Sequence, residues 1–442
     1  MDIKNTPVYG WPPGEVTPRL AGTLVSDNVN RRSVFTYEAD WLASGYSFLS
    51  PDFKASPQSL RVPTSPGQSG LYGLFQDTSP DLFGQKAQEV RFGREVAGRL
   101  EAATRCQVNG AGALALGELL PERLQLVAQE DFLDRLRARR RTKAPEIEIE
   151  ELILQDLKQL PGIGGMKPKL TVLSKRDEYI FKFKELGDDP WSLHAESALL
   201  EMAKASGINA CDSQVVELPS DYGNGILIRR FDRCAVAEGQ LRIGYASAAT
   251  VAGLDQPSRV NADLTMSATN TVPPHRIARS YPTLVAKMRR WVGSDEQHRR
   301  QAQELWRRIV FNLLTRNCDD HPRNTGFLFN SNSRIWELSP AFDISTLVLN
   351  LALPCAASDY LVETSTRARR KPLGVINVAN RERLIDAAEL HYFWDRTAAA
   401  DWFDSTRELV RTRWREFLVE TGVPEKFVGA YETTLGTDWP QR

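Results

Sequence analysis

The sequence predicts an α+β fold in which strands gather before about residue 235 and helices follow. Short runs rich in β-branched and aromatic residues recur in the first half, as at 20–25 and 34–37, and the second of these alternates. In the second half the clearest run, at 295–314, places Leu305, Ile309 and Leu313 on one apolar stripe at helical spacing. A chain of 442 residues that is 42% hydrophobic can bury a large core behind these elements.

These patterns divide the chain into three parts. Residues 1–105 predict a small, mainly β N-terminal subdomain, and residues 106–235 predict a strand-rich lobe with a glycine cluster, a strand lysine and a connecting segment. Residues 236–442 predict an all-helical C-terminal lobe, with a helix at 281–292 before the one at 295–314 and further helices within 376–442.

Composition narrows the function classes. Lys plus Arg and Asp plus Glu both number 56, so the formal net charge is zero, which argues against nucleic-acid binding by the whole surface. The five cysteines show no C-x-x-C pair or metal-ligand spacing, as expected of reduced thiols. The N-terminus lacks the apolar core of a signal peptide, and no run approaches the roughly 18 apolar residues of a membrane span. We therefore expect a soluble, cytoplasmic protein with no membrane partner.

Residues 317–324 read Asn-Cys-Asp-Asp-His-Pro-Arg-Asn, directly after the strongest helical run. Asp319 and Asn324 have the Asp-x-x-x-x-Asn spacing of a protein-kinase catalytic loop, in which the carboxylate meets the attacking hydroxyl and the carboxamide holds Mg²⁺. Two β-like runs, 325–329 and 334–338, then lead to Asp343, which we interpret as the second metal ligand. The alternatives are an ordinary polar turn at 317–324 and a helix cap or turn at Asp343.

A glycine cluster precedes a strand-like run at 169–173. Gly164 and Gly165 let backbone N–H groups approach phosphates, and Lys167 and Lys169 add positive charge. Most glycine clusters are only tight turns. The stretch also departs from the Walker pattern, because Leu follows Lys169, so a strand-to-strand phosphate loop suits it better than a P-loop.

Lys182 lies inside an apolar and aromatic strand. A lysine in this position either extends to the edge of the sheet or is a buried ammonium with a fixed partner, and in a kinase the strand lysine binds the α- and β-phosphates and pairs with a glutamate of the next helix. The helical run at 191–206 offers Glu196 and Glu201, and we prefer Glu196 because it is nearer the helix start.

The strand that ends at 228 continues into Arg229-Arg230-Phe231-Asp232-Arg233. A strand that leaves one lobe for another is where an adenine ring is held, and Arg229 and Phe231 are the candidates there. Arginine-rich strand ends are equally common as structural salt-bridge sites, so both interpretations stay open.

Together these motifs resemble the HipA family of serine/threonine kinases, the toxins of HipA–HipB toxin–antitoxin modules. The resemblance spans nearly the whole chain and rests on motifs in the family's order: Phe35-x-Tyr37-x-x-x-Trp41-Leu42, Asp77-x-Ser79-Pro80-Asp81-x-x-Gly84, Gly164-Gly165-Met166-Lys167-Pro168-Lys169, Arg230-Phe231-Asp232-Arg233, Asn317-x-Asp319-Asp320-His321-x-x-Asn324 and Phe342-Asp343.

The resemblance implies a two-lobed protein-kinase-like fold and phosphorylation of a protein Ser or Thr with ATP and Mg²⁺. Asp319 would be the catalytic base, Asn324 and Asp343 the metal ligands, and Lys182 the phosphate-binding lysine, while the backbone at 229–231 with the Phe231 ring would hold adenine. Asp320 and His321 would shape the loop. A HipB-like helix-turn-helix antitoxin is the implied partner, with DNA contacted only indirectly through it, and aminoacyl-tRNA synthetases are among the implied targets.

One position departs from the family. Well-known members carry an autophosphorylated serine in the phosphate loop, where this chain has Gly162, so the charge-assisted contacts of a phosphoserine cannot form there. Two other functions remain as alternatives: a catalytically weak co-repressor that acts with its antitoxin on DNA, and a small-molecule kinase of related fold.

Overall fold

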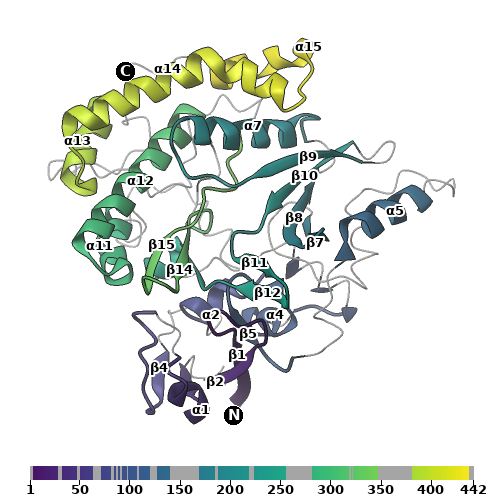
Figure 1. Cartoon of the computed structure of the whole chain (residues 1–442), viewed down its shortest axis with the longest axis vertical. Coiled ribbons are helices and arrows are strands. Elements are labelled where there is room, and N and C mark those ends of the chain that lie inside the picture. The colour runs from purple at the N-terminus through teal and green to yellow at the C-terminus, as the bar shows by residue number, and fades with distance from the viewer. Residues whose placement is uncertain are drawn as a thin grey trace.

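A computed structural model describes most of the chain (Figure 1). The residues that it describes are 3–27, 32–46, 50–62, 71–80, 84–85, 88–89, 92–96, 98–106, 109–119, 127–139, 169–184, 188–218, 223–254, 281–317, 320, 322–346 and 381–437. Four predicted site residues, Gly164, Gly165, Lys167 and Asp319, lie outside the described residues, as do Gly162 and His321.

The N-terminal part is built on a five-stranded antiparallel sheet in the order β4-β3-β2-β1-β5. Its strands are β1 (Ile3–Gly10), β2 (Arg19–Asp27), β3 (Arg32–Tyr37), β4 (Leu60–Val62) and β5 (Leu114–Leu116). The predicted strands at 20–25 and 34–37 are confirmed within β2 and β3. Phe35 of β3 packs on Phe53 and Phe75, with ring centroids 6.0 and 5.4 Å away. These aromatic rings give a small subdomain the apolar burial that it needs.

The short helices with described bounds beside this sheet are α1 (Ala39–Ala43), α2 (Leu74–Asp77) and α4 (Arg99–Cys106). The sheet also takes its edge strand β5 from beyond residue 105, since Tyr9 of β1 pairs with Ala115. The predicted boundary at 105 therefore falls between strands of one sheet, and the chain recrosses the subdomain before it continues.

A second five-stranded sheet follows in the order β6-β7-β8-β10-β9. Its strands are β6 (Val127–Ala128), β7 (Lys169–Ser174), β8 (Asp177–Phe183), β9 (Ser213–Glu217) and β10 (Asn224–Arg229), and its helices are α5 (Gln129–Arg139) and α7 (Ser192–Ala205). Phe132, Phe181 and Phe183 are fully buried between α5 and the sheet. Helix α7 packs on β9 and β10 and ends before Gly207, whose φ of 78° stops a helix as the sequence predicts.

The prediction that residues 236–442 are all helical is wrong. They contain the three-stranded sheet β13-β14-β15 and most of the β11-β12 hairpin. The strands are β11 (Arg233–Val236), β12 (Gly239–Arg242), β13 (Tyr245–Ser247), β14 (Gly326–Asn330) and β15 (Ile335–Leu338). The hairpin of β14 and β15 follows the alternation visible in the sequence, with Phe327, Phe329, Trp336 and Leu338 buried. The third strand, β13, comes from 80 residues earlier and has no such local signal.

Among the described residues, the other regular elements of this part are helices. They are α8 (Ala248–Val251), α11 (Tyr281–Val292), α12 (Asp295–Leu314), α13 (Arg381–Tyr392), α14 (Arg396–Glu420), α15 (Glu425–Val428), a 3₁₀ turn (Gly429–Tyr431) and a π-helical turn (Glu432–Gly436). The predicted helices at 281–292 and 295–314 are confirmed as α11 and α12. The rings of Trp394 and Trp402 pack on Trp306 of α12, so these partly buried tryptophans lie against the core.

Figure 1 shows how these parts are arranged. The N-terminal sheet lies at one end of the molecule and the long helix α14 lies at the other, where it packs along α7. The second sheet and the β14-β15 hairpin lie between them. Within the part of the chain that the structure describes, no helix combines the length and the apolar character needed to cross a bilayer.

Candidate active site

Three charged side chains from distant elements meet at Lys182. Its ammonium Nζ lies 2.6 Å from Oε1 of Glu196 and 2.7 Å from Oδ1 of Asp343. Lys182 lies on β8, Glu196 on α7, and Asp343 five residues after β15. The structure thus brings together three of the predicted site residues, and Lys182 pairs with the glutamate that the sequence favours. Glu201 instead forms a surface ion pair with Lys204.

The electrostatics of this cluster favour a charged lysine. Burial by itself would lower the pKa of Lys182, but the carboxylates of Asp343 and Glu196 outweigh it and raise that pKa above its usual range. The Lys182 and Glu196 side chains are 7% and 6% exposed, whereas that of Asp343 is 34% exposed. The cluster therefore has a buried cation at its base and one carboxylate open to a ligand.

Backbone strain helps to place Asp343. Its φ is 58°, a left-handed conformation that is uncommon outside glycine and tolerated best by Asp and Asn. The backbone two residues before Asp343 is held by two hydrogen bonds, from Cys211 N to Ala341 O and from Ala341 N to Asn209 O. Phe342 packs on Phe231, 5.3 Å away, so its ring fills an apolar site while the next residue turns toward Lys182.

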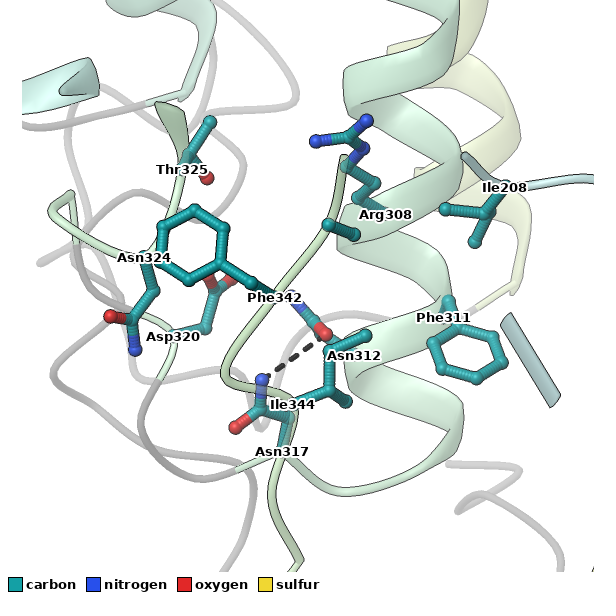
Figure 2. Close-up of a pocket in the computed structure, with 11 residues that line it drawn as sticks. Ile208, Arg308, Phe311, Asn312, Asn317, Asp320, Asn324, Thr325, Phe342 and Ile344 are labelled. Atoms are coloured by element: carbon teal, nitrogen blue, oxygen red, sulfur yellow. Dashed lines mark hydrogen bonds between the residues drawn. The ribbon is translucent and has the colours of Figure 1, made fainter. Parts of the chain in front are cut away.

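The 317–324 loop begins where α12 ends. Arg316 adopts a φ of 53°, and the backbone N–H of Asn317 donates to Asn312 O at 2.8 Å. The Asn317 side chain also donates to Asn312 Oδ1, as Figure 2 shows. Asp320 is buried and accepts a hydrogen bond from the Tyr281 hydroxyl at 2.6 Å. The Tyr281 bond fixes the Asp320 side chain inside the protein, so Asp320 has a structural contact in the loop. Its neighbour in the chain, Asp319, lies outside the described residues.

A cavity of about 20 Å³ lies between the α12 end, this loop and the segment before Asp343 (Figure 2). Its lining includes Asn317, Asp320, Asn324 and Phe342. A space of this size and polarity holds about one water molecule. Asn324 therefore lines the same cavity as Phe342 and Ile344, the two neighbours of Asp343 in the chain.

The arginine-rich stretch divides into buried and exposed residues. Arg230, Asp232 and Arg233 are buried, and Asp232 Oδ2 lies 2.7 Å from Arg230 and 2.8 Å from Arg233. Glu178 of β8 completes the cluster, 3.3 Å from Arg233. Burial by itself raises the pKa of Asp232, but the two arginines outweigh it and hold that pKa well below its usual range. For these three residues the structural interpretation holds.

This buried cluster joins the second sheet to the segment before β5. Asp232 accepts a hydrogen bond from the backbone N–H of Gly112 at 2.8 Å, and Arg233 donates to the carbonyl of Gly110 at 2.9 Å. Gly112 has a φ of 79° and lies against the Tyr245 backbone, so a side chain would be strained there and would have no space.

Arg229 and Phe231 differ from the buried residues between them. The Arg229 side chain is half exposed and donates to Asp177 at 3.0 Å. The backbone N–H groups of Arg229 and Arg230 already donate to the carbonyls of Asp212 and Glu178. A nucleotide base at this strand end would thus meet the partly exposed Phe231 ring and backbone carbonyls, rather than these two donors or the Arg229 guanidinium.

Lys169 is the one predicted phosphate-loop residue among the described residues. It begins β7 and lies directly opposite Lys182 in the antiparallel ladder with β8. Side chains of directly opposed residues point to the same face of a sheet. Lys169 and Lys182 therefore share a face, which is the one turned toward Glu196.

Comparison with known proteins shows which family the chain belongs to. The model of the HipA-like C-terminal domain matches residues 162–414, more than half of the chain. The chain belongs to the HipA family. The solved structure of the HipA, HipB and operator DNA complex from the Shewanella oneidensis MR-1 toxin–antitoxin system is similar to this chain. The similarity covers 97% of this chain and 96% of that one. Its TM-score is 0.59 at 17% sequence identity, which shows a shared fold.

A second solved structure, the Helicobacter pylori proinflammatory kinase CtkA, matches 62% of this HipA-family chain and 94% of its own. Its sequence identity is 15% and its TM-score of 0.33 is too low to support an inference. No curated protein matches the sequence.

Proposed function

We propose that this HipA-family protein is an ATP- and Mg²⁺-dependent serine/threonine protein kinase with a two-lobed kinase-like fold, acting in the cytoplasm as a growth-arresting toxin. The observation that carries the proposal is the Lys182–Glu196–Asp343 cluster. A protein that only binds a partner has no need of a buried lysine shared between a helix glutamate and a partly exposed aspartate. In kinases that arrangement binds phosphates and metal.

The donor set fits Mg²⁺. Asp343 supplies a carboxylate and Asn324 a carboxamide oxygen, both hard ligands, and Asp319 would add the catalytic carboxylate. Among the described residues no group of three or more His, Cys, Asp and Glu could hold a metal by itself. Mg²⁺ is ordinarily bound by one or two protein ligands together with substrate phosphates, so this sparse set suits it. When bound, it would neutralise phosphate charge.

The protein's own groups have distinct roles in this proposal. The Lys182 ammonium binds the α- and β-phosphates, together with Lys169 and with Gly164, Gly165 and Lys167 of the glycine cluster. Glu196 fixes the ammonium from behind. Asp319 accepts the proton of the attacking Ser or Thr hydroxyl. The Phe231 ring packs on the adenine.

The partner is proposed from the family and the fold. The Shewanella structure is titled as a complex of HipA with HipB and operator DNA. We infer for this chain a HipB-like helix-turn-helix antitoxin, with DNA contacted indirectly through it. The proposed protein substrate is a component of the translation machinery, such as an aminoacyl-tRNA synthetase.

Transfer of labelled phosphate from ATP into a cell lysate tests the function. Wild type should label discrete protein bands, and Asp319→Asn and Asp343→Asn should each abolish them. Expression of the wild type should also arrest growth, and Asp343→Asn should relieve the arrest. If soluble, ATP-binding wild type neither labels protein nor slows growth, the co-repressor function is the better one.

A further inference from the structure

The catalytic loop is held from behind by the first turn of α8. The backbone N–H of Ala248 donates to Thr325 O at 2.8 Å, and that of Ala249 donates to Pro322 O at 3.1 Å. These two carbonyls lie on either side of Asn324 in the chain. Immediately before α8, Ser247 of β13 pairs with Gly326 of β14. The α8 turn therefore fixes the backbone on both sides of the proposed metal ligand.

Asp77 of the N-terminal subdomain fixes that turn. One carboxylate oxygen accepts from the Ser247 backbone N–H at 2.8 Å, and the other accepts from the Ser247 hydroxyl at 2.7 Å. The Ser247 hydroxyl in turn caps α8 by accepting from Thr250 N at 3.2 Å. All three residues are buried. Asp77 and Ser247 are 170 positions apart, so this contact depends on how the subdomain docks.

A second contact links the same two regions. Arg323, next to Asn324, donates to the carbonyl of Ser79 at 3.4 Å, two residues after Asp77. Thr250 of α8 donates to Gly73 O at 3.0 Å, four residues before Asp77. The N-terminal subdomain thus contacts both the loop and the turn that supports it.

We propose that Asp77 is a positioning residue for phosphoryl transfer, holding the catalytic loop in register through Ser247 and the first turn of α8. The proposal rests on the proposed kinase function. It assigns the N-terminal subdomain a part in the reaction, although Asp77 lies outside residues 162–414. Asp77 itself touches neither nucleotide nor substrate.

The test compares Asp77→Ala with Asp52→Ala in the full-length protein. Asp52 also belongs to the N-terminal part and also contacts the later part of the chain, pairing with Arg290 of α11 at 3.5 Å. Within the described residues, no hydrogen bond or ion pair joins Asp52 to α8 or to the catalytic loop. Both variants remove one carboxylate that joins the N-terminal part to the later part of the chain, and only that of Asp77 is bonded to the residue that precedes α8.

Three measurements are made on each variant. In Asp77→Ala we expect kcat to fall about 10- to 100-fold, because small displacements of a reacting group cost this much. The KM for ATP should change little, since loss confined to kcat marks an interaction of the transition state. Hydrogen exchange at the amides of Ala248 and Ala249 should accelerate. Asp52→Ala should resemble wild type in kcat and exchange, and Asp77→Asn, which keeps an acceptor for Ser247 N–H, should recover part of both.

Equal kcat and equal exchange in the two alanine variants would overturn the proposal. The proposal would also be overturned if Asp77→Ala lowered ATP affinity and melting temperature together and left kcat unchanged, because that result is expected of a purely structural residue. If wild type transfers no phosphate, the kinase function fails, while the exchange measurement still decides whether Asp77 holds the loop. If Asp77→Ala does not fold, Ser247→Ala takes its place with the same control; it removes one of the two bonds to Asp77 and also the hydroxyl cap of α8.

Discussion

Two buried charge clusters share strand β8 and differ in what they leave exposed. Lys182 joins Glu196 and Asp343, and its cluster has one cation for two carboxylates and an aspartate side chain that is 34% exposed. Glu178 joins Arg230, Asp232 and Arg233, and none of these side chains is more than 6% exposed. Arg242 of β12, which pairs with Arg233 in the β11-β12 hairpin, is a third cation beside them. The first cluster can still bind a cation or exchange a contact, whereas the second is sealed from solvent. The exposure of one carboxylate therefore separates the candidate site from the buried structural cluster.

The largest effect on stability should come from the sealed cluster. Asp232→Ala leaves two buried guanidinium groups with Glu178 alone, and removing one partner of a buried ion pair costs about 3–5 kcal/mol. Urea unfolding of the variant should show a loss in this range. A loss well under 1 kcal/mol would mean that the cluster is not the joint between the second sheet and Gly112.

A substitution in the Lys182 cluster should lower phosphate transfer more than it lowers stability. Glu196→Gln leaves the Lys182 ammonium paired with Asp343 alone, so we expect phosphate transfer to fall about 10²–10³-fold, as on loss of one preorganised electrostatic group. The loss of stability should be smaller than for Asp232→Ala, because Asp343 still neutralises the lysine. Labelled-ATP transfer and urea unfolding measure the two effects.

Glu201→Gln is the matched control on the same helix. Glu201 lies five residues further along α7 and pairs at the surface with Lys204. Its variant should keep wild-type transfer and stability. If Glu201→Gln loses as much activity as Glu196→Gln, the helix glutamate has been wrongly assigned.

Acid should weaken the sealed cluster in a defined pH range. The pKa of Asp232 is held below its unfolded value by Arg230 and Arg233, so the ionised carboxylate stabilises the folded state fully above the unfolded pKa of about 4. That stabilisation declines as the pH falls below about 4 toward the lower folded-state pKa. The difference in unfolding free energy between wild type and Asp232→Asn should therefore shrink from pH 5 to about pH 2. A constant difference over this range would contradict the ion pairing.

The smallest effect should come from the exposed neighbour of the sealed cluster. Arg229→Ala breaks only the half-exposed pair with Asp177, and such pairs contribute about 1 kcal/mol or less. The KM for ATP should also stay unchanged, since the guanidinium is turned toward Asp177. A marked rise in that KM would restore Arg229 as a nucleotide contact.

The sequence predicted the local elements best where a strong periodic pattern exists. Helices α11 and α12 and the β14-β15 hairpin follow from apolar spacing that each segment carries itself. Strand β13 was missed because the three residues at 245–247 have no pattern until they pair with β14. Strand β5 was missed for the same reason. The all-helical prediction for 236–442 also disregarded the β-like runs at 325–329 and 334–338, which form β14 and β15.

The candidate site divides in the same way. The Lys182–Glu196 pair could be predicted because a strand and the next helix fix both residues within 14 positions of each other. The role of Arg230, Asp232 and Arg233 could not, since arginine at a strand end suits a ligand or an ion pair equally. Only the docking of Glu178 and Gly112 decided it.

By itself, then, the sequence determined which residues could do chemistry at the 317–324 loop and the strand lysine, because side-chain type and spacing are local properties. Tertiary structure alone decided which of them meet. It brought Asp343 to Lys182 across 161 positions and Asp77 to Ser247, in front of α8, across 170. Such contacts depend on the packing of whole elements, which no short stretch of sequence encodes.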